Sequence, residues 1–233
     1  MKKTGFSLAE ILIALAVIGV VSALTIPQLS LGVNKQAMAS ALSSSMTGVE
    51  NALTTIIMRN EVKSLKETDF YTASKTSAAD TLKALSPYYG IVKSGDKPTD
   101  NNMYSSLSIR KLGGGTDTLP ESITLITKHG SALIITPIKE PKTTELSVDV
   151  QQLYDLIIDV NGNKQPNMIG RDIFKYAVGD DGKLYPYGGK AYAEYIGSDS
   201  NVWSGTGTLK CNGTGDGWGC AGKLAVNGYK MDY

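Results

Sequence analysis

The sequence predicts an α+β protein in which a long N-terminal helix packs on an antiparallel β-sheet head. Apolar side chains run almost without interruption over residues 6–29 and then recur every three or four residues to about residue 57, which is the helical period. From Ser122 onward the period changes to two, which is typical of strands. The chain has 233 residues, of which 42% are hydrophobic and 19% charged, so one anchor and one modest globular domain account for its length.

The first apolar stretch, residues 6–29, contains one charged side chain, that of Glu10. At about 1.5 Å per residue, roughly twenty helical residues cross the ~30 Å hydrocarbon core of a bilayer. Lys2 and Lys3 precede the stretch, and the positive-inside tendency keeps that end in the cytoplasm. A secretory signal peptide has a shorter apolar region followed by a small-residue cleavage site, and no convincing site of that kind follows here. We therefore expect a single-pass membrane helix with the rest of the chain exported.

The start of the chain resembles the leader of type IV prepilins and of the related pseudopilins of type II secretion. It reads Lys2-Lys3-Thr4-Gly5 followed by Phe6-Ser7-Leu8-Ala9-Glu10. In that family a membrane-embedded prepilin peptidase cuts after the glycine and methylates the new N-terminal residue. The resemblance thus implies a leader over residues 1–5, cleavage between Gly5 and Phe6, and methylation of Phe6. It also implies a pilin-like fold and assembly with identical or related subunits on a platform in the bacterial inner membrane.

Two interpretations of Glu10 stand side by side. A carboxylate inside a membrane is costly, so such a group usually has a partner and a role. The plainer interpretation places Glu10 among the lipid headgroups at the helix N-terminus, where the helix dipole favours an anion. The resemblance implies instead that Glu10 accepts the ammonium of Phe6 from a neighbouring subunit, which sets the axial register of a filament.

Pro27 matches the helix-weakening proline of the same family. A proline removes one backbone hydrogen bond, and Gly32 follows closely, so the helix should kink or loosen over residues 24–32. Membrane helices tolerate prolines, so Pro27 by itself carries little information. With the resemblance, the more informative hypothesis is a segment that becomes flexible during filament assembly.

The second half of the expected helix and the head follow the apolar stretch. Residues 30–65 predict an amphipathic helix, from about Asn34 to about Leu65, whose apolar face covers a sheet. The exported head occupies residues 66–233, and its first part shows only turn signals and a short helical piece. The later part predicts four or so antiparallel strands with one apolar face, as two hairpins and a strand between them. The expected strands lie at residues 122–127, 131–136, 153–160, 171–178 and 183–186.

Cys211 and Cys220 are the two cysteines of the chain, and both lie on the exported side. Two cysteines with one histidine cannot complete a four-ligand zinc site, so the spacing favours a disulfide near the end of the chain. Alternating glycines around Trp218 are reminiscent of a nucleotide-binding loop, but a cysteine stands at each end and no βαβ unit is expected. We expect instead a stapled surface loop with an exposed aromatic side chain.

Candidate ligand and catalytic residues in the head are few. Oxygen-bearing side chains that alternate in one turn suggest a calcium site, but the spacing fails the EF-hand pattern and such residues are ordinary turn formers. The residues concerned are Asp159, Asn161, Asn163, Asn167 and Asp172. His129 stands alone at the tip of a hairpin and is expected to be a solvated turn residue. No catalytic motif is present in the sequence, so we predict no enzyme, no metal and no cofactor.

The function expected from these features is structural. The chain is interpreted as a subunit of a type IV pilus or a type II secretion pseudopilus, anchored in the inner membrane with its head in the periplasm before it polymerises. One alternative is a minor tip subunit that binds a surface, DNA or a secreted substrate. Another is an anchored exported protein with an accidental leader. The net charge of +1 provides no global electrostatic footprint for nucleic acid.

Overall fold

The computed structural model describes residues 7–138, 150–189 and 210–233, and within helix α1 it leaves the side chains of residues 23–33 undescribed. The chain divides into two compact units, residues 1–37 and 38–233, which are described separately here. Among the residues described, no helix combines the length and the apolarity that a membrane crossing requires. The span expected over residues 6–29 is therefore not shown.

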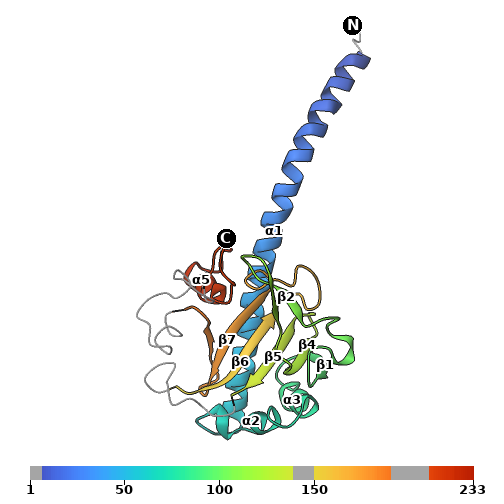
Figure 1. Ribbon diagram of the computed structural model, residues 1–233. Helices are drawn as coiled ribbons and strands as arrows, with labels where there is room; N and C mark the ends of the chain where they lie inside the picture. The colour runs from blue at the N-terminus through green and yellow to red at the C-terminus, as the bar shows by residue number, and fades with distance from the viewer. Residues whose placement is uncertain (1–6, 139–149, 190–209) are drawn as a thin grey trace, which may run out of the picture. The chain divides into compact units, whose positions relative to one another are not determined.

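Helix α1 extends over Leu8–Arg59 and belongs to both units (Figure 1). The chain remains helical through Pro27, so the loosening expected over residues 24–32 stays a prediction for the assembled state. The helix ends about six residues before the expected Leu65. Glu61 adopts a positive φ of 54°, and the N–H groups of Glu61 and Val62 donate to carbonyls of the last helical turn. This Schellman-type ending has a glutamate where glycine is usual, so no glycine marks the end of the helix in the sequence.

The head is built on a six-stranded antiparallel sheet with the strand order β1-β4-β5-β6-β7-β8. An N-terminal helix followed by an antiparallel sheet confirms the α+β class. The strands are β1 (Ile91–Gly95), β4 (Ile123–Thr127), β5 (Ala132–Pro137), β6 (Gln152–Asp159), β7 (Ile173–Gly179) and β8 (Leu184–Pro186). All five expected strands are present within one or two residues of their predicted bounds.

Residues 66–121 contain more structure than their sequence predicts. They supply the edge strand β1 and a separate two-stranded sheet of β2 (Ser108–Arg110) and β3 (Thr116–Thr118). They also supply helices α2 (Asp69–Ala73) and α3 (Ala78–Leu85), the second of which contains the short helical piece expected in this part of the head. Each helix begins with a side-chain cap, from Thr68 and Ser77 respectively. These elements are too short to produce a clear hydrophobic period.

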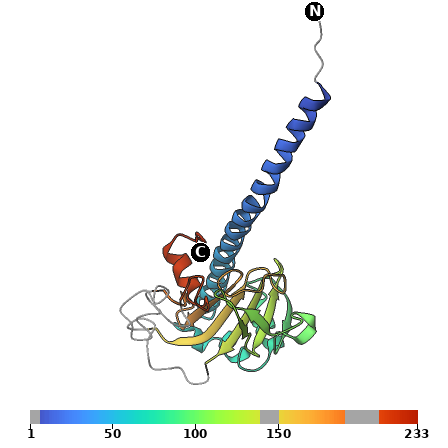
Figure 2. The same cartoon turned by 45° about the horizontal axis from the view of Figure 1, so that its top comes forward.

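The second half of α1 covers one face of the six-stranded sheet (Figures 1 and 2). Its buried side chains are spaced as one helical stripe, and each is at most 4% exposed. They pack with alternate residues of the central strands, including Leu133, Leu156 and Phe174. The stripe consists of Ala39, Leu42, Val49, Ala52, Leu53 and Ile56.

The opposite face of the sheet is also buried, which differs from the single apolar face expected. Ala132, Ile134 and Ile157 point away from α1 into a second core. The segment that carries β2 and β3 covers this face, with Tyr104 and Ile109 among the contacts. Because both faces are covered, β5 and β6 have nearly continuous apolar runs in place of strict alternation.

The turn between β7 and β8 fastens the sheet to the end of α1. Gly182 has a positive φ of 79°, and a Cβ there would lie 3.0 Å from the Cδ1 atom of Ile57. The carbonyl of Asp180 accepts the N–H of Leu65 at 2.7 Å, and the Glu50 carboxylate accepts the N–H of Leu184 at 2.8 Å. The turn of the second predicted hairpin therefore also contacts the helix.

Candidate functional site

The N-terminal candidate site begins with Ser7 and Glu10, which form a reciprocal cap on α1. The Ser7 N–H and hydroxyl donate to the Glu10 Oε2 atom at 2.8 and 3.0 Å, and the Glu10 N–H donates to the Ser7 Oγ atom at 3.3 Å. This arrangement is a capping box, and the Ser-x-x-Glu spacing of Ser7 and Glu10 is the sequence signal for it. Glu10 is thus exposed and hydrogen-bonded within its own subunit.

The helix beyond Glu10 presents apolar side chains on all sides. Ile11, Leu15, Ile18 and Val21 are 48%, 62%, 60% and 53% exposed. More than half of the surface is also exposed for five further apolar side chains of this segment, those of Leu8, Leu12, Ile13, Val17 and Val20. A helix that is apolar all round is normally buried, so this surface needs a covering.

The processing residues Gly5 and Phe6 lie outside the described residues. Pro27 lies in a helical stretch whose side chains are not described. The roles expected for these three residues therefore remain predictions.

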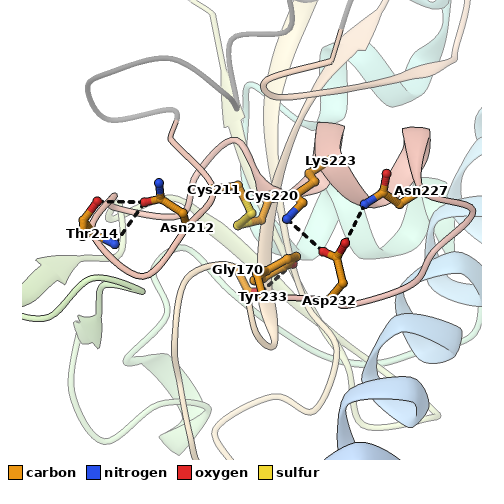
Figure 3. The surroundings of a disulfide bond; sticks show 9 residues. All are labelled: Gly170, Cys211, Asn212, Thr214, Cys220, Lys223, Asn227, Asp232 and Tyr233. Carbon is orange, nitrogen blue, oxygen red and sulfur yellow. Dashed lines mark hydrogen bonds and ion pairs between the residues drawn. A yellow bond between two sulfur atoms is a disulfide. The ribbon is translucent and has the colours of Figure 1, made fainter.

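The second candidate site is the C-terminal lock, by which we mean the Cys211–Cys220 disulfide, helix α5 (Cys220–Val226) and the last residues of the chain (Figure 3). The expected pairing of Cys211 with Cys220 is confirmed. Both cysteines are buried, at 2% and 0% exposure, so the bond lies inside the fold. Gly170 lies directly against it, since a Cβ there would come within 2.7 Å of the Cys220 Sγ atom.

Polar contacts fasten the chain end to the same place (Figure 3). Asp232 accepts hydrogen bonds from Lys223 at 2.8 Å and from Asn227 at 3.2 Å, so it closes the end of the chain back onto α5. The Tyr233 hydroxyl donates to the Gly170 carbonyl at 2.8 Å. The terminal residues are therefore part of the packed head.

Trp218, expected to be an exposed aromatic side chain, is partly buried against the second core. Its indole N–H donates to the Asp117 carboxylate in β3 at 3.1 Å. An ion pair of 3.0 Å between Lys111 and Asp216 makes a second link to the same small sheet. The expectation was wrong because Asp117 lies 101 residues from Trp218 in the chain, and only folding brings the two together.

The turn weighed as a calcium site contains two buried carboxylates that protein donors already engage. Asp159 accepts the Tyr104 hydroxyl at 2.6 Å and the Asn161 N–H at 3.2 Å. Asp172 accepts the N–H groups of Asn167 and Met168 at 2.8 and 2.7 Å. Burial, the largest cause in both cases, raises the pKa of Asp159 and of Asp172 above the ordinary value, and the charge of Asp172 adds to the rise at Asp159. Asn163 is exposed and does not join them.

The carboxylates therefore fix the loop between β6 and β7. Over residues 7–138, 150–189 and 210–233, no group of three or more His, Cys, Asp or Glu residues is placed to hold a metal ion. His129 lies exposed in the turn between β4 and β5, as expected of a solvated turn residue.

Comparison with known proteins identifies one region. Residues 1–26 match the prokaryotic N-terminal methylation motif, which is the signature of type IV pilins and pseudopilins. Neither a curated protein nor a solved structure matches the chain. The match includes Gly5, Phe6, Ser7 and Glu10 and ends before Pro27, so it concerns the start of α1 and leaves the head unassigned.

Removal of the disulfide should destabilise the head. Closing a loop of about ten residues contributes about 2.7 kcal/mol through the entropy of the unfolded chain. We expect the Cys211→Ser, Cys220→Ser double variant to lose about that much unfolding free energy in urea titrations of the detergent-solubilised chain. The parent treated with a reductant is the matched control and should unfold at the same urea concentration as the variant. Equal midpoints for the oxidised parent and the variant would contradict the assignment.

The two buried carboxyl groups, Asp159 and Asp172, should stabilise the folded head more in mild acid than at neutral pH. Their folded pKa values lie above the ordinary 3.8, so the folded state retains protons that the unfolded state releases. Their contribution is present below the ordinary pKa and is lost as the pH rises through the raised values. We expect the Asp159→Asn variant to show a flatter fall in melting temperature between pH 4 and neutrality.

The control for this measurement is Glu121→Gln, which removes an exposed carboxylate just before β4. It should preserve the pH dependence of the parent. If Asp159→Asn and Glu121→Gln give the same pH profile, the two buried carboxyl groups do not govern it.

Proposed function

We propose that this chain is a structural subunit of a type IV pilus or a type II secretion pseudopilus, and not an enzyme. In this proposal a prepilin peptidase removes residues 1–5 and methylates Phe6, and the subunits then polymerise through the first half of α1. The observation that carries the proposal is the methylation motif at residues 1–26. The α+β architecture, with a long N-terminal helix on an antiparallel sheet, is consistent with it.

The exposed apolar surface of α1 supports polymerisation. Residues Leu8–Val21 expose at least nine large apolar side chains by 48% to 80%. Each square ångström of such surface costs about 25 cal/mol in water, so a covering by lipid or by other apolar helices is strongly favoured. In the proposal, inner-membrane lipid covers this surface before assembly while the head lies in the periplasm. Neighbouring copies of the helix replace the lipid in the filament.

The geometry at Glu10 supports a role in register. The carboxylate is exposed, and its Oε2 atom accepts both Ser7 donors. A carboxylate has about four lone-pair positions, so acceptor capacity remains for a second donor. Cleavage after Gly5 creates an ammonium on Phe6, and the ammonium of a neighbouring subunit is the cation that the proposal pairs with Glu10. This interaction would recur once per subunit along the filament.

The most direct test concerns the processed N-terminus. We expect mass spectrometry of the native, membrane-derived protein to find a chain that begins with N-methylphenylalanine at residue 6. A Gly5→Leu variant should retain residues 1–5, because the peptidase requires the glycine in this proposal. A native product that begins at Met1, or that lacks all of residues 6–29, would overturn the proposal.

A second test separates the charge of Glu10 from its capping role. Glu10→Gln preserves an oxygen acceptor for Ser7 but removes the charge, whereas Glu10→Ala removes both. We expect both variants to be processed. Their filament yield should be at least about tenfold lower than that of the parent, which is the factor associated with one charge-assisted hydrogen bond. Filament yield is measured by shearing and quantitative immunoblotting.

The matched control is Ser7→Ala, which weakens the cap and retains the Glu10 charge. It should assemble close to the parent level. If Glu10→Gln assembles as well as the parent does, the charge has no role in register and capping alone explains the residue.

A further inference from the structure

A hollow of about 470 Å³ lies within the unit of residues 38–233, between the second half of α1, the Tyr88–Gly90 loop and the turn from β4 to β5. Its volume is in the range of sites for small organic ligands. None of the residues that carry processing or assembly in the proposal above contributes to it. The hollow therefore calls for a separate explanation.

Small side chains on α1 create the space. Ala41, Ser44, Ser45 and Gly48 recur on one helix face and form one wall. The Tyr89 ring packs so closely on Gly48 that a Cβ there would lie 2.7 Å from the ring. Tyr89 is partly buried, and burial raises the pKa of its hydroxyl above the ordinary value, while its hydrogen bond with Ser45 acts in the opposite direction. This wall is rigid and presents hydroxyl groups.

The opposite wall brings positive charge. Lys128 and His129 come from the turn between β4 and β5, and no carboxylate is among the lining residues. Lys128 is exposed, and the described part of the chain contains no ion pair to its ammonium. Glu50, on the next turn of α1, points elsewhere and accepts the Leu184 N–H. Among the described residues, no carboxylate of the chain therefore neutralises the Lys128 ammonium.

A second aromatic ring completes the lining. Tyr88 lines the hollow beside Tyr89, and the Arg59 guanidinium lies 5.7 Å from the centre of its ring. Tyrosine rings offer an apolar face together with a polar hydroxyl. The lining of the hollow thus includes two tyrosines, three serines and the Lys128 side chain, and no acidic residue.

We propose that this hollow binds an acidic sugar, that is, a monosaccharide unit that carries a carboxylate. The apolar parts of Tyr88, Tyr89 and Val160 suit the C–H surface of a sugar ring, the serine hydroxyls suit its hydroxyl groups, and Lys128 suits its carboxylate. A neutral sugar leaves the Lys128 ammonium without a partner, and a bare anion leaves the rings and hydroxyls unused. The proposal goes beyond the filament function and does not depend on it.

The test uses the full chain in a mild detergent, with amide chemical shifts as the readout. We expect glucuronic acid to produce saturable shifts at residues 88–90 and 128–131. Glucose and inorganic phosphate should bind at least about tenfold more weakly, because glucose lacks the carboxylate and phosphate lacks the sugar ring.

Three variants sharpen the test. Lys128→Gln should weaken glucuronic acid binding roughly tenfold, since it removes one charge-assisted contact. Ser44→Trp places a large ring in the hollow from an exposed helix position and should abolish binding. Lys93→Gln removes an exposed lysine from β1, outside the hollow, and should bind as the parent does. Unchanged melting temperatures show that the variants remain folded, and Lys128 is exposed enough for its replacement to be tolerated.

Three results would overturn the proposal. They are the absence of saturable shifts with glucuronic acid, equal affinity for glucose and glucuronic acid, and equal affinity for phosphate and glucuronic acid. An unchanged affinity in Lys128→Gln would also overturn it. None of these results affects the filament proposal, whose tests measure the N-terminus and the filament yield.

Discussion

The packing of α1 on the six-stranded sheet is the interaction on which the head depends. One helical stripe, from Ala39 to Ile56, is almost completely buried against alternate residues of the central strands. Among the described residues, helices α2, α3 and α5 each contribute fewer buried apolar side chains to this core than α1 does. Because interiors are close-packed, the position of this stripe also determines where the β7–β8 turn and the Tyr89 loop meet the helix.

The two halves of α1 make opposite demands on their surroundings. In the second half, apolar residues are confined to one face, and the sheet buries them. In the first half, apolar residues occur on all faces and remain exposed in the single subunit. The first half of α1, which is apolar on all faces, is therefore stable only when something outside the chain covers it.

The far end of the chain is secured by several independent contacts. The buried disulfide and the Asp232 contacts to α5 close the segment from Cys211 onward on itself. The Tyr233 hydrogen bond to the Gly170 carbonyl connects it to the loop that precedes β7. Trp218 and Asp216 connect the same segment to β2 and β3. The polar pair Asp159 and Tyr104 joins β6 to the layer on its second face. A domain of modest size gains resistance to unfolding from such contacts.

The sequence by itself determined the features that neighbouring residues encode. These include the methylation motif, the helical period of α1, the two hairpins with their turns, and the pairing of the only two cysteines. The tertiary structure alone decided the second buried face of the sheet, the place of Trp218, the hollow beside Tyr89 and the engagement of Asp159 by Tyr104. The physical reason is the range of the interactions. Periodicity and turn chemistry act over a few residues, whereas these contacts join side chains that lie tens of residues apart and meet only when the chain has packed.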